Sequence, residues 1–489
     1  MNLKNHIKFF IISIVVLFTI IFHIYPILTD NLRANSVLLV AISMAVLWIS
    51  EAIPFGATSL IPIILFPLLD VMSSNDVAME YMNDIILLFI GGFLISIAME
   101  QWNLHKRISL KILSVLGSSY SKILLGFILS TALLSMFISN TATALMMLPI
   151  GLAVNKKITE FFDENSAKKF SLSIMLAIAF SCSIGGIATL IGTPPNLVFK
   201  KIYEINFPDA QEITFGNWML FAFPITFFLL FILWLTFAKI FFKIENQTKL
   251  YTVFFKKQYI ELGRISYEEK IILFVFVMTA LLWIFRKDIN LGVIIIPGWS
   301  NLSSLFNKIN DTTISIFSAI LLFIIPSKFN RRILNKESFS KIPWEIILLF
   351  GGGFALAKAF SVSGLALIIA NNLKVLSIVH PILIVFMVAF IMVLLTELTS
   401  NTATAQTVLP ILASLSLAIN IHPLMVMVPA TLSVSFAFML PVATPPNAIV
   451  FSSGYIKISE MVKYGFIIDL IAILLTTLYS YFFIEKILG

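Results

Sequence analysis

The chain carries one twelve-residue phrase twice. Residues 139–150 read SNTATALMMLPI and residues 400–411 read SNTATAQTVLPI, so nine of twelve positions are identical. Both copies lie within long apolar segments, where small polar side chains are costly unless they bind something. A polar motif repeated at that depth is typical of a transporter built from two internal repeats.

The repeat extends beyond this phrase on both sides. Upstream, DIILLFIGGF at 84–93 resembles EIILLFGGGF at 345–354, and one offset of 261 residues aligns both matches. Downstream, GTPPN at 192–196 corresponds to ATPPN at 443–447, where the offset falls by ten. The charged linker at 156–169, which the second copy lacks, accounts for this loss.

The composition is that of a membrane protein. Of the 489 residues 59% are hydrophobic and 12% are charged, whereas soluble domains average about 25% charged residues. The net charge of +8 does not point to nucleic acid, because the lysines and arginines lie in short loops between apolar runs. One cysteine excludes an internal disulfide, and the five histidines are scattered without the spacing of a metal site. No intramembrane His/Asp cluster supports an enzyme.

We therefore expect an all-α polytopic membrane protein with about eleven transmembrane helices plus two re-entrant hairpins, arranged as two inverted-topology repeats. The hairpins are expected at 123–155 and 380–418, with the repeated phrase at each tip. The spans are expected near 7–27, 34–52, 55–70, 84–101, 170–199, 217–240, 271–285, 312–326, 343–372, 422–452 and 463–485.

Loop charges favour hairpins over single crossings. With the N-terminus inside and both segments re-entrant, 24 Lys and Arg lie inside and 8 outside, with Lys358 within a span. If 123–155 were one long tilted helix, the basic loops between the two segments would change sides and this bias would collapse. The expectation is a multi-pass cell-membrane protein with a cytoplasmic N-terminus and an extracytoplasmic C-terminus.

Each polar element offers defined chemistry. At a hairpin tip one helix ends in free carbonyl groups and the next begins with free N–H groups, so the tip can hold a small cation and an anion. Two prolines break a helix and leave unpaired carbonyl groups, which are tolerated where they line a cavity. A lone Ser-Asn-Thr is usually a helix cap and a lone Pro-Pro usually a kink, but four such elements paired by a repeat are far more specific.

Three intramembrane charges have open roles. Glu397 is either a proton-coupling carboxylate or, the reading that we favour, a group that orients the tip through hydrogen bonds. Lys358 snorkels, pairs with a carboxylate or contacts the substrate, and Asp469 has no evident partner.

The sequence resembles the divalent anion:sodium symporter (DASS) family from about residue 45 to its end. The motifs that carry the resemblance are WISEAIP at 48–54, NDIILLFIGGF at 83–93, LTELTSNT at 395–402 and LPVATPPN at 440–447. The resemblance implies a homodimer in which a transport domain slides against a scaffold as an elevator. We expect scaffold helices at 1–121 and 246–375, with 84–121 and 343–375 opening the repeats, and the transport domain at 122–245 and 376–489.

The resemblance also implies the site residues. One Na+ would bind Ser135, Ser139, Asn140 and the backbone near Gly192, and the second would bind Thr396, Ser400, Asn401 and the backbone near Ala443. The substrate would meet Asn140, Thr141, Asn401, Thr402, Thr444 and Pro445. Ala443, where the first repeat has Gly192, is a mild departure that a backbone ligand survives.

The expected function is sodium-coupled symport of C4-dicarboxylates such as succinate, malate or fumarate. A dicarboxylate exchanger of the same fold, or a sulfate or citrate carrier, is the alternative. A channel is less favoured, because polarity is concentrated at two tips and two breaks.

Overall fold

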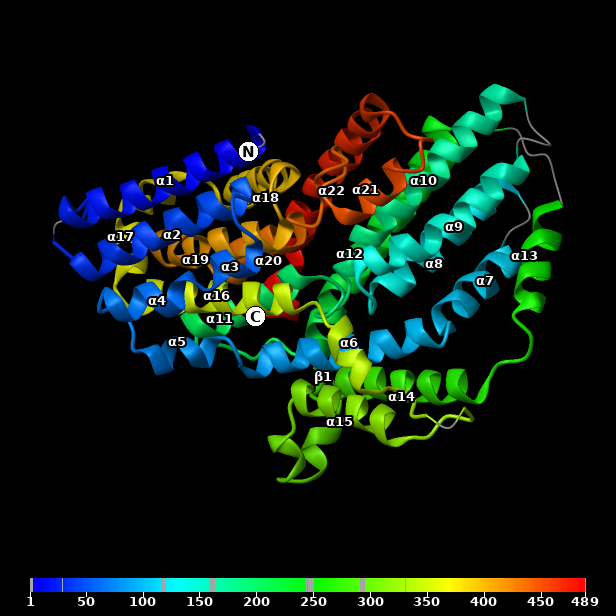
Figure 1. Cartoon of the computed structure of the whole chain (residues 1–489), viewed down its shortest axis with the longest axis horizontal. Coiled ribbons are helices and arrows are strands. Elements are labelled where there is room, and N and C mark those ends of the chain that lie inside the picture. The colour runs from blue at the N-terminus through cyan, green and yellow to red at the C-terminus, as the bar shows by residue number, and fades with distance from the viewer. Residues whose placement is uncertain are drawn as a thin grey trace.

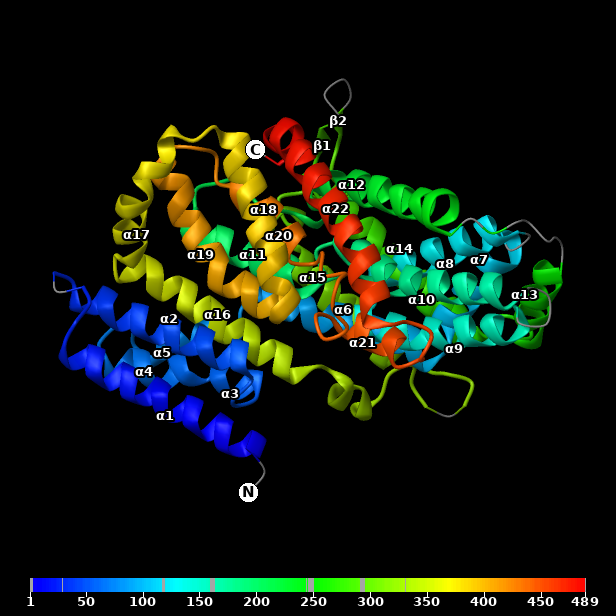
Figure 2. The same cartoon turned by 90° about the horizontal axis from the view of Figure 1, so that it is seen from above.

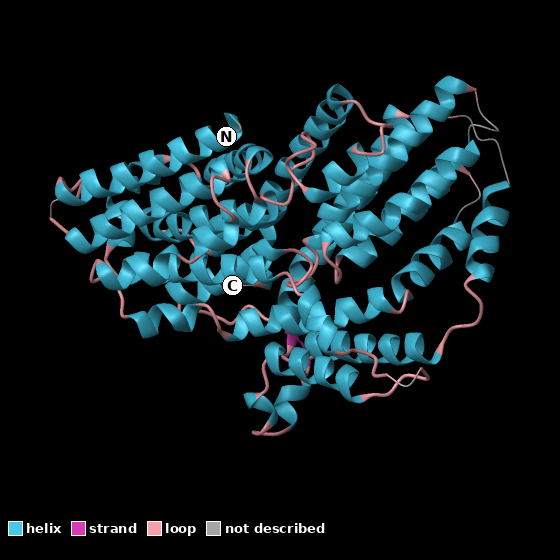
Figure 3. Cartoon of the chain, in the orientation of Figure 1, coloured by secondary structure: helices cyan, strands magenta, loops and turns pink. Residues whose placement is uncertain are grey.

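The computed structural model describes residues 3–28, 30–116, 119–158, 163–242, 244, 250–290, 295–329 and 331–488. Nearly all secondary structure in these ranges is helical (Figure 3). The exceptions are a two-residue antiparallel ladder between β1 (Ile289–Asn290) and β2 (Ile295–Ile296) and an isolated antiparallel bridge between Pro326 and Arg332. The expected all-α class is therefore confirmed.

Two sets of seven helices follow one another in the same order. The first set is α6 (Asp84–Gln101), α7 (Leu104–Leu116), α8 (Tyr120–Ser135), α9 (Asn140–Ile158), α10 (Glu164–Gly186), α11 (Pro194–Asn206) and α12 (Phe215–Leu235). The second set is α16 (Trp344–Val362), α17 (Leu365–Leu373), α18 (Pro381–Leu398), α19 (Asn401–Ile419), α20 (Leu424–Ser433), α21 (Pro445–Phe451) and α22 (Ile458–Ile487). The repeat found in the sequence is thus a repeat of whole elements.

The remaining helices precede or separate these sets. Before the first lie α1 (Leu3–Ile24), α2 (Leu32–Ser50), α3 (Phe55–Ser59), α4 (Ile61–Leu68) and α5 (Ser74–Glu80). Between the sets lie the π-helix η1 (Thr236–Phe241), α13 (Leu250–Glu261), α14 (Tyr267–Ile284), α15 (Asp311–Ile324) and the 3-10 turns η2 (Trp299–Leu302), η3 (Phe306–Lys308) and η4 (Lys336–Lys341). A further 3-10 turn, η5 (Lys374–Ile378), follows α17.

Glycines let each repeat dock its first helix closely. α6 packs on α15 and α16 packs on α3. A Cβ at Gly91 would lie 2.2 Å from Ser315 Oγ, and one at Gly352 would lie 2.5 Å from the Ser59 carbonyl oxygen. These glycines therefore serve close helix packing, which is common between membrane helices.

Both predicted hairpins form. α8 ends at Ser135 and α9 begins at Asn140, and the two helices pack on each other and on α10. α18 ends at Leu398 and α19 begins at Asn401, and this pair packs on α20 in the same way. The alternative of one long tilted helix at 123–155 is therefore wrong.

The two hairpins lie in opposite halves of the molecule and are connected by cross-packing. Along the long axis, α8 and α9 lie in one half, whereas α19 lies in the other and α18 lies in that half near the middle (Figures 1 and 2). α9 packs against α21 of the second repeat, and α19 packs against α11 of the first. Each hairpin is thus completed by the short helix that follows the other repeat's Pro-Pro break.

Some expected spans are interrupted. The span at 343–372 is two helices, because Gly364, in the left-handed region at φ 78°, separates α16 from α17. The spans at 170–199 and 422–452 break before their Pro-Pro pairs, as the motif predicts, and 55–70 divides into α3 and α4. Nine helices in the described ranges are long and apolar enough to cross a membrane, and both arms of the second hairpin are among them. The domain boundary at 245–246 lies outside the described residues.

Candidate ion and substrate site

The first tip is closed by a hydroxyl and an amide. The Ser135 hydroxyl, on the last residue of α8, donates to Asn140 Oδ1 at 2.6 Å and also lies 2.8 Å from the backbone carbonyl oxygen of Cys182 on α10. Ser135 is fully buried, so its oxygen atom is held within the protein. Three oxygen atoms from three helices thereby converge at the start of α9.

The second tip repeats this arrangement with threonine in place of serine. The Thr396 hydroxyl donates to Asn401 Oδ1 at 2.6 Å and lies 2.9 Å from the Val434 carbonyl oxygen. Thr396 is also fully buried. We call the group of oxygen atoms at each tip a half-site. The two half-sites share one geometry, although their side chains come from positions 261 residues apart.

Each Pro-Pro break is held by the asparagine that ends its motif. Asn196 Nδ2 donates to the carbonyl oxygens of Gly186 at 3.2 Å and Thr189 at 2.7 Å. Asn447 Nδ2 donates to those of Ala437 at 2.8 Å and Leu440 at 2.9 Å, at the same two sequence separations. Both amides thus fold the unwound segment before the prolines into the same loop.

In the first repeat the loop and the tip approach too closely for any side chain. A Cβ at Gly192 would lie 2.5 Å from the Gly186 carbonyl oxygen and 2.9 Å from that of Met136. A Cβ at Gly186 would lie 2.8 Å from Asn140 Oδ1 and 3.2 Å from the Gly192 carbonyl oxygen. Carbonyl and amide oxygens therefore crowd together beside these two glycines.

The remaining predicted residues surround the half-sites. Ser139 Oγ accepts a hydrogen bond from the Ala142 N–H at 3.2 Å, and Ser400 stands at the N-cap of α19. Thr444 Oγ1 accepts from the Asn447 N–H at 3.3 Å. Ala443 and Thr402 are buried, Thr141 is half-buried and Pro445 is exposed. The structure thus gathers Ser135, Asn140 and Gly192 in one group and Thr396 and Asn401 in another.

The two halves differ in exposure. Beside the second tip and break, Leu398 is 74% exposed and Val442 is 83% exposed. Their counterparts in the first repeat, Phe137 and Ile191, are half-buried and line a small cavity with Ser139 against α6. The second half-site therefore lies closer to the surface of the chain than the first.

A family model described as the sodium:sulfate symporter transmembrane region matches residues 3–487. The chain belongs to this family. The expected membership, the transporter class and the expectation that the chain is not an enzyme are confirmed by this match.

Relatives within this family are close in sequence and length. The sodium-dependent dicarboxylate transporter SdcS of Staphylococcus saprophyticus is 44% identical over 470 residues, which cover 94% of this chain and 88% of that protein. SdcS of Staphylococcus aureus NCTC 8325 is 45% identical over 466 residues, covering 93% and 86%.

Two solved structures share the fold. The Alcanivorax borkumensis YdaH transporter aligns with a TM-score of 0.56 at 12% identity, covering 84% of this chain and 87% of that one. Neisseria gonorrhoeae MtrF aligns with a TM-score of 0.59 at 14% identity, covering 86% and 84%. These likenesses support the architecture and carry no inference about substrate.

Sequence reasoning did not identify the backbone carbonyl groups that lie at the two tips. The carbonyl oxygens of Cys182 and Val434 gave no signal, because any residue supplies a carbonyl group. Asn196 and Asn447 had a signal, since each closes a repeated Thr-Pro-Pro-Asn motif. Thr189, whose hydroxyl donates to the Met136 carbonyl oxygen at the first tip, lies outside any repeated motif.

Two of the intramembrane charges, Lys358 and Glu397, have different surroundings. Lys358 lines a cavity of about 850 Å³ with Arg33, Asp70 and Glu80. The carboxylate of Glu397 accepts hydrogen bonds from the N–H groups of Met439 and Leu440. This contact favours the tip-orienting reading of Glu397.

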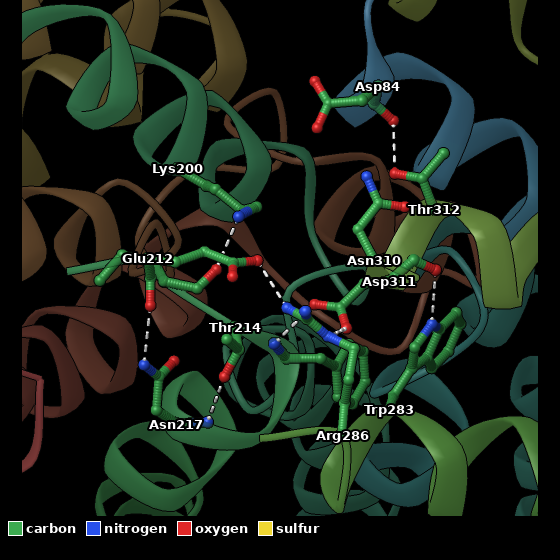
Figure 4. A network of polar contacts seen from close by, with 12 residues as sticks. Asp84, Lys200, Glu212, Thr214, Asn217, Trp283, Arg286, Asn310, Asp311 and Thr312 are labelled. Carbon is green, nitrogen blue, oxygen red and sulfur yellow. Dashed lines mark hydrogen bonds and ion pairs between the residues drawn. The ribbon is translucent and has the colours of Figure 1, made fainter. Parts of the chain in front are cut away.

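A second polar network joins the end of α14, the start of α12 and the start of α15 (Figure 4). Arg286 donates to Asp311 at 2.6 Å and to Glu212 at 2.5 Å, and Asp311 also accepts from the Phe215 N–H at 2.9 Å. Burial opposes the charge of Arg286, but the carboxylates of Asp311 and Glu212 outweigh it and raise the pKa of the guanidinium. This network fastens the start of α12 to the start of α15.

Proposed function

We propose that this protein is a sodium-coupled carrier that imports C4-dicarboxylates, such as succinate, malate and fumarate, across the cell membrane. Relatives that are 44–45% identical over nearly its whole length are named sodium-dependent dicarboxylate transporters. Similarity of this extent supports the same substrate class and the same coupling ion.

The co-transported Na+ ions are proposed to bind at the two half-sites. Their ligands would be Ser135, Ser139, Asn140 and the backbone near Gly192 for one ion, and Thr396, Ser400, Asn401 and the backbone near Ala443 for the other. Hydroxyl, amide and backbone carbonyl oxygens at unwound helices are the ligands that sodium-coupled carriers use. The matched hydroxyl–amide pairs support two ions held in the same manner.

The dicarboxylate is proposed to bind beside these ions, between the two tips. Asn140 and Asn401 each accept a hydrogen bond at Oδ1, so the amide Nδ2 of each is available to donate to a substrate carboxylate. Both asparagines begin helices, α9 and α19, whose N-terminal N–H groups favour an anion. Thr141, Thr402, Thr444 and Pro445 would complete the contact.

Movement and assembly are proposed from the family resemblance. The transport domain would comprise 122–245 and 376–489 and would slide as an elevator against scaffold helices at 1–121 and 246–375 within a homodimer. The cross-packing of α9 on α21 and of α19 on α11 supports a unit in which both half-sites move together. The loop charges support a cytoplasmic N-terminus and an extracytoplasmic C-terminus.

The observation that carries the proposal is the repeated pair, Ser135 with Asn140 and Thr396 with Asn401. The test is uptake of labelled succinate into proteoliposomes that contain the purified protein. We expect accumulation with an inward Na+ gradient and none when K+ replaces Na+. Strong succinate counterflow without sodium-driven accumulation would contradict symport and support the exchanger. Stronger competition by sulfate or citrate than by malate would overturn the substrate class.

A further inference from the structure

In each repeat, hydrogen bonds connect the hairpin tip to the unwound loop that precedes the Pro-Pro pair. In the first repeat, the Thr189 hydroxyl donates to the Met136 carbonyl oxygen, and the Gly192 N–H in turn donates to Thr189 Oγ1 at 3.1 Å. Met136 follows Ser135, so this bridge joins the ion half-site to the loop that Asn196 folds. The loop and the tip thereby hold one position relative to each other.

The second repeat cannot build this bridge. By the repeat offsets, Glu397 stands where Met136 stands, and Leu440 stands where Thr189 stands. Leucine has no hydroxyl, so the donor of the first repeat is missing from the loop.

The second repeat makes the same connection with other atoms. Glu397 Oε1 accepts from the Met439 N–H at 2.8 Å, and Oε2 accepts from the Leu440 N–H at 3.0 Å. In both repeats the tip supplies the acceptor and the loop supplies the donor. A side-chain carboxylate has replaced a backbone carbonyl group, and backbone N–H groups have replaced a hydroxyl.

We propose that Glu397 is a positioning residue for the second ion half-site, where it replaces the Met136–Thr189 bridge of the first. This inference depends on the proposed function, since it assigns a role at the proposed Na+ site. Glu397 directly follows Thr396, and its two acceptors fix the loop whose Leu440 carbonyl group Asn447 also holds. Glu397 thus sets the distance between Thr396 and the Ala443 backbone.

The Glu397 carboxylate accepts hydrogen bonds from N–H groups and forms no ion pair with any residue that the structure describes. Glu397 is 3% exposed. α12, α20 and the 434–444 loop contain no Lys, Arg or His, and the nearest lysine on α22, Lys463, is exposed. Asp469 of α22 is 2% exposed and faces both the Glu397 carboxyl group and the same loop at Phe438, so a second buried carboxyl group adjoins Glu397. Hydrogen bonds to a carboxylate are stronger than neutral ones, so two of them can anchor the loop.

The pseudo-symmetry provides a direct test, which is to transplant the bridge of the first repeat into the second. Glu397→Met removes the acceptor and should raise the Na+ concentration for half-maximal succinate uptake by about tenfold, as expected for losing a hydrogen bond to a charged group. The succinate KM at saturating Na+ should change little. The double variant Glu397→Met with Leu440→Thr should recover most of the Na+ affinity.

A second readout does not depend on transport. Na+ should raise the unfolding temperature of the detergent-purified wild type, and Glu397→Met should need more Na+ for the same rise, with recovery in the double variant. Glu397→Gln, which keeps one acceptor oxygen, should fall between and serves if Glu397→Met does not fold. Glu485→Met, which removes an exposed carboxylate of α22, is the matched control.

The outcomes separate the two proposals. If neither uptake nor the unfolding temperature of the wild type changes with Na+, the proposed function is wrong and this inference is wrong with it. If the wild type responds to Na+ but the Glu397 variants respond equally, only the positioning role is overturned. A double variant no better than Glu397→Met would also overturn it, because a bridge of the first-repeat type would then be irrelevant there.

Discussion

Ser135 Oγ and Asn140 Oδ1 lie 2.6 Å apart, although Ser135 ends one arm of the first hairpin and Asn140 begins the other. The hydroxyl closes the end of α8 against the start of α9, and the amide nitrogen of Asn140 is the group that we propose donates to the substrate. Because Thr396 and Asn401 repeat this contact, loss of either asparagine should have the same effect.

Asn140→Ala and Asn401→Ala should each abolish sodium-driven succinate uptake, by at least about a hundredfold, since each removes a proposed ion ligand and a proposed substrate donor together. Both variants should elute as monodisperse protein in size-exclusion chromatography. Asn372→Ala, at an exposed asparagine of α17, is the control and should transport normally. Full activity in either tip variant would remove that asparagine from the site.

Gly192→Ala should impair transport strongly, whereas Ala443→Gly should be tolerated. The added methyl group would lie 2.5 Å from the Gly186 carbonyl oxygen, closer than a carbon atom can approach. The Na+ dependence of uptake measures the effect. Gly56→Ala, whose nearest contact would be an ordinary 3.4 Å, serves as the control. Equal activity of Gly192→Ala and wild type would contradict the tight first half-site.

Asn196→Ala and Asn447→Ala should lower stability by similar amounts, about 1–3 kcal/mol, because each removes an amide that donates to two carbonyl groups of the unwound loop. The midpoint of thermal unfolding in detergent reports this loss. A large effect in one repeat and none in the other would show that the two loops are not held in the same way.

Arg286→Met should destabilise the protein by about 3–5 kcal/mol, because it leaves the Asp311 carboxylate buried without its cation. Arg286→Met combined with Asp311→Asn should recover part of this loss, since the stranded charge is then gone. The unfolding midpoint and the yield of monodisperse protein are the measurements. No recovery in the double variant would argue against an electrostatic cause.

Cysteine substitutions at Lys156 and Lys169 should react with a membrane-impermeant maleimide only when the cytoplasmic face is accessible. Both positions flank the linker between α9 and α10. The natural Cys182 is fully buried and should stay unlabelled. Labelling of either position from outside intact cells would reverse the proposed orientation.

The repeated phrase and the loop charges were enough to predict both hairpins, their tips and their relation by a repeat. This succeeded because Ser-Asn-Thr and Pro-Pro act on local backbone, so their consequences depend little on distant residues. The interruption at Gly364 was missed, since a glycine in an apolar run gives no indication of its φ angle.

The bridge made by Glu397 required the structure. Its partners are the backbone N–H groups of Met439 and Leu440, which carry no mark in the sequence. From the sequence we also interpreted Ala443, at the position equivalent to Gly192, as a mild departure. In the structure Gly192 is confined by two carbonyl oxygens, so alanine does not fit at the first-repeat position.

The packing of α9 against α21 has a consequence for biosynthesis. The ribosome must add about 300 residues after Asn140 before Pro445 exists, which takes roughly 15–60 s at ordinary elongation rates. During that interval the first hairpin is in the translocon or the lipid without α21, the helix that later packs against α9. A chain that stalls before α21 would therefore expose an unfinished surface, a natural target for membrane quality-control proteases.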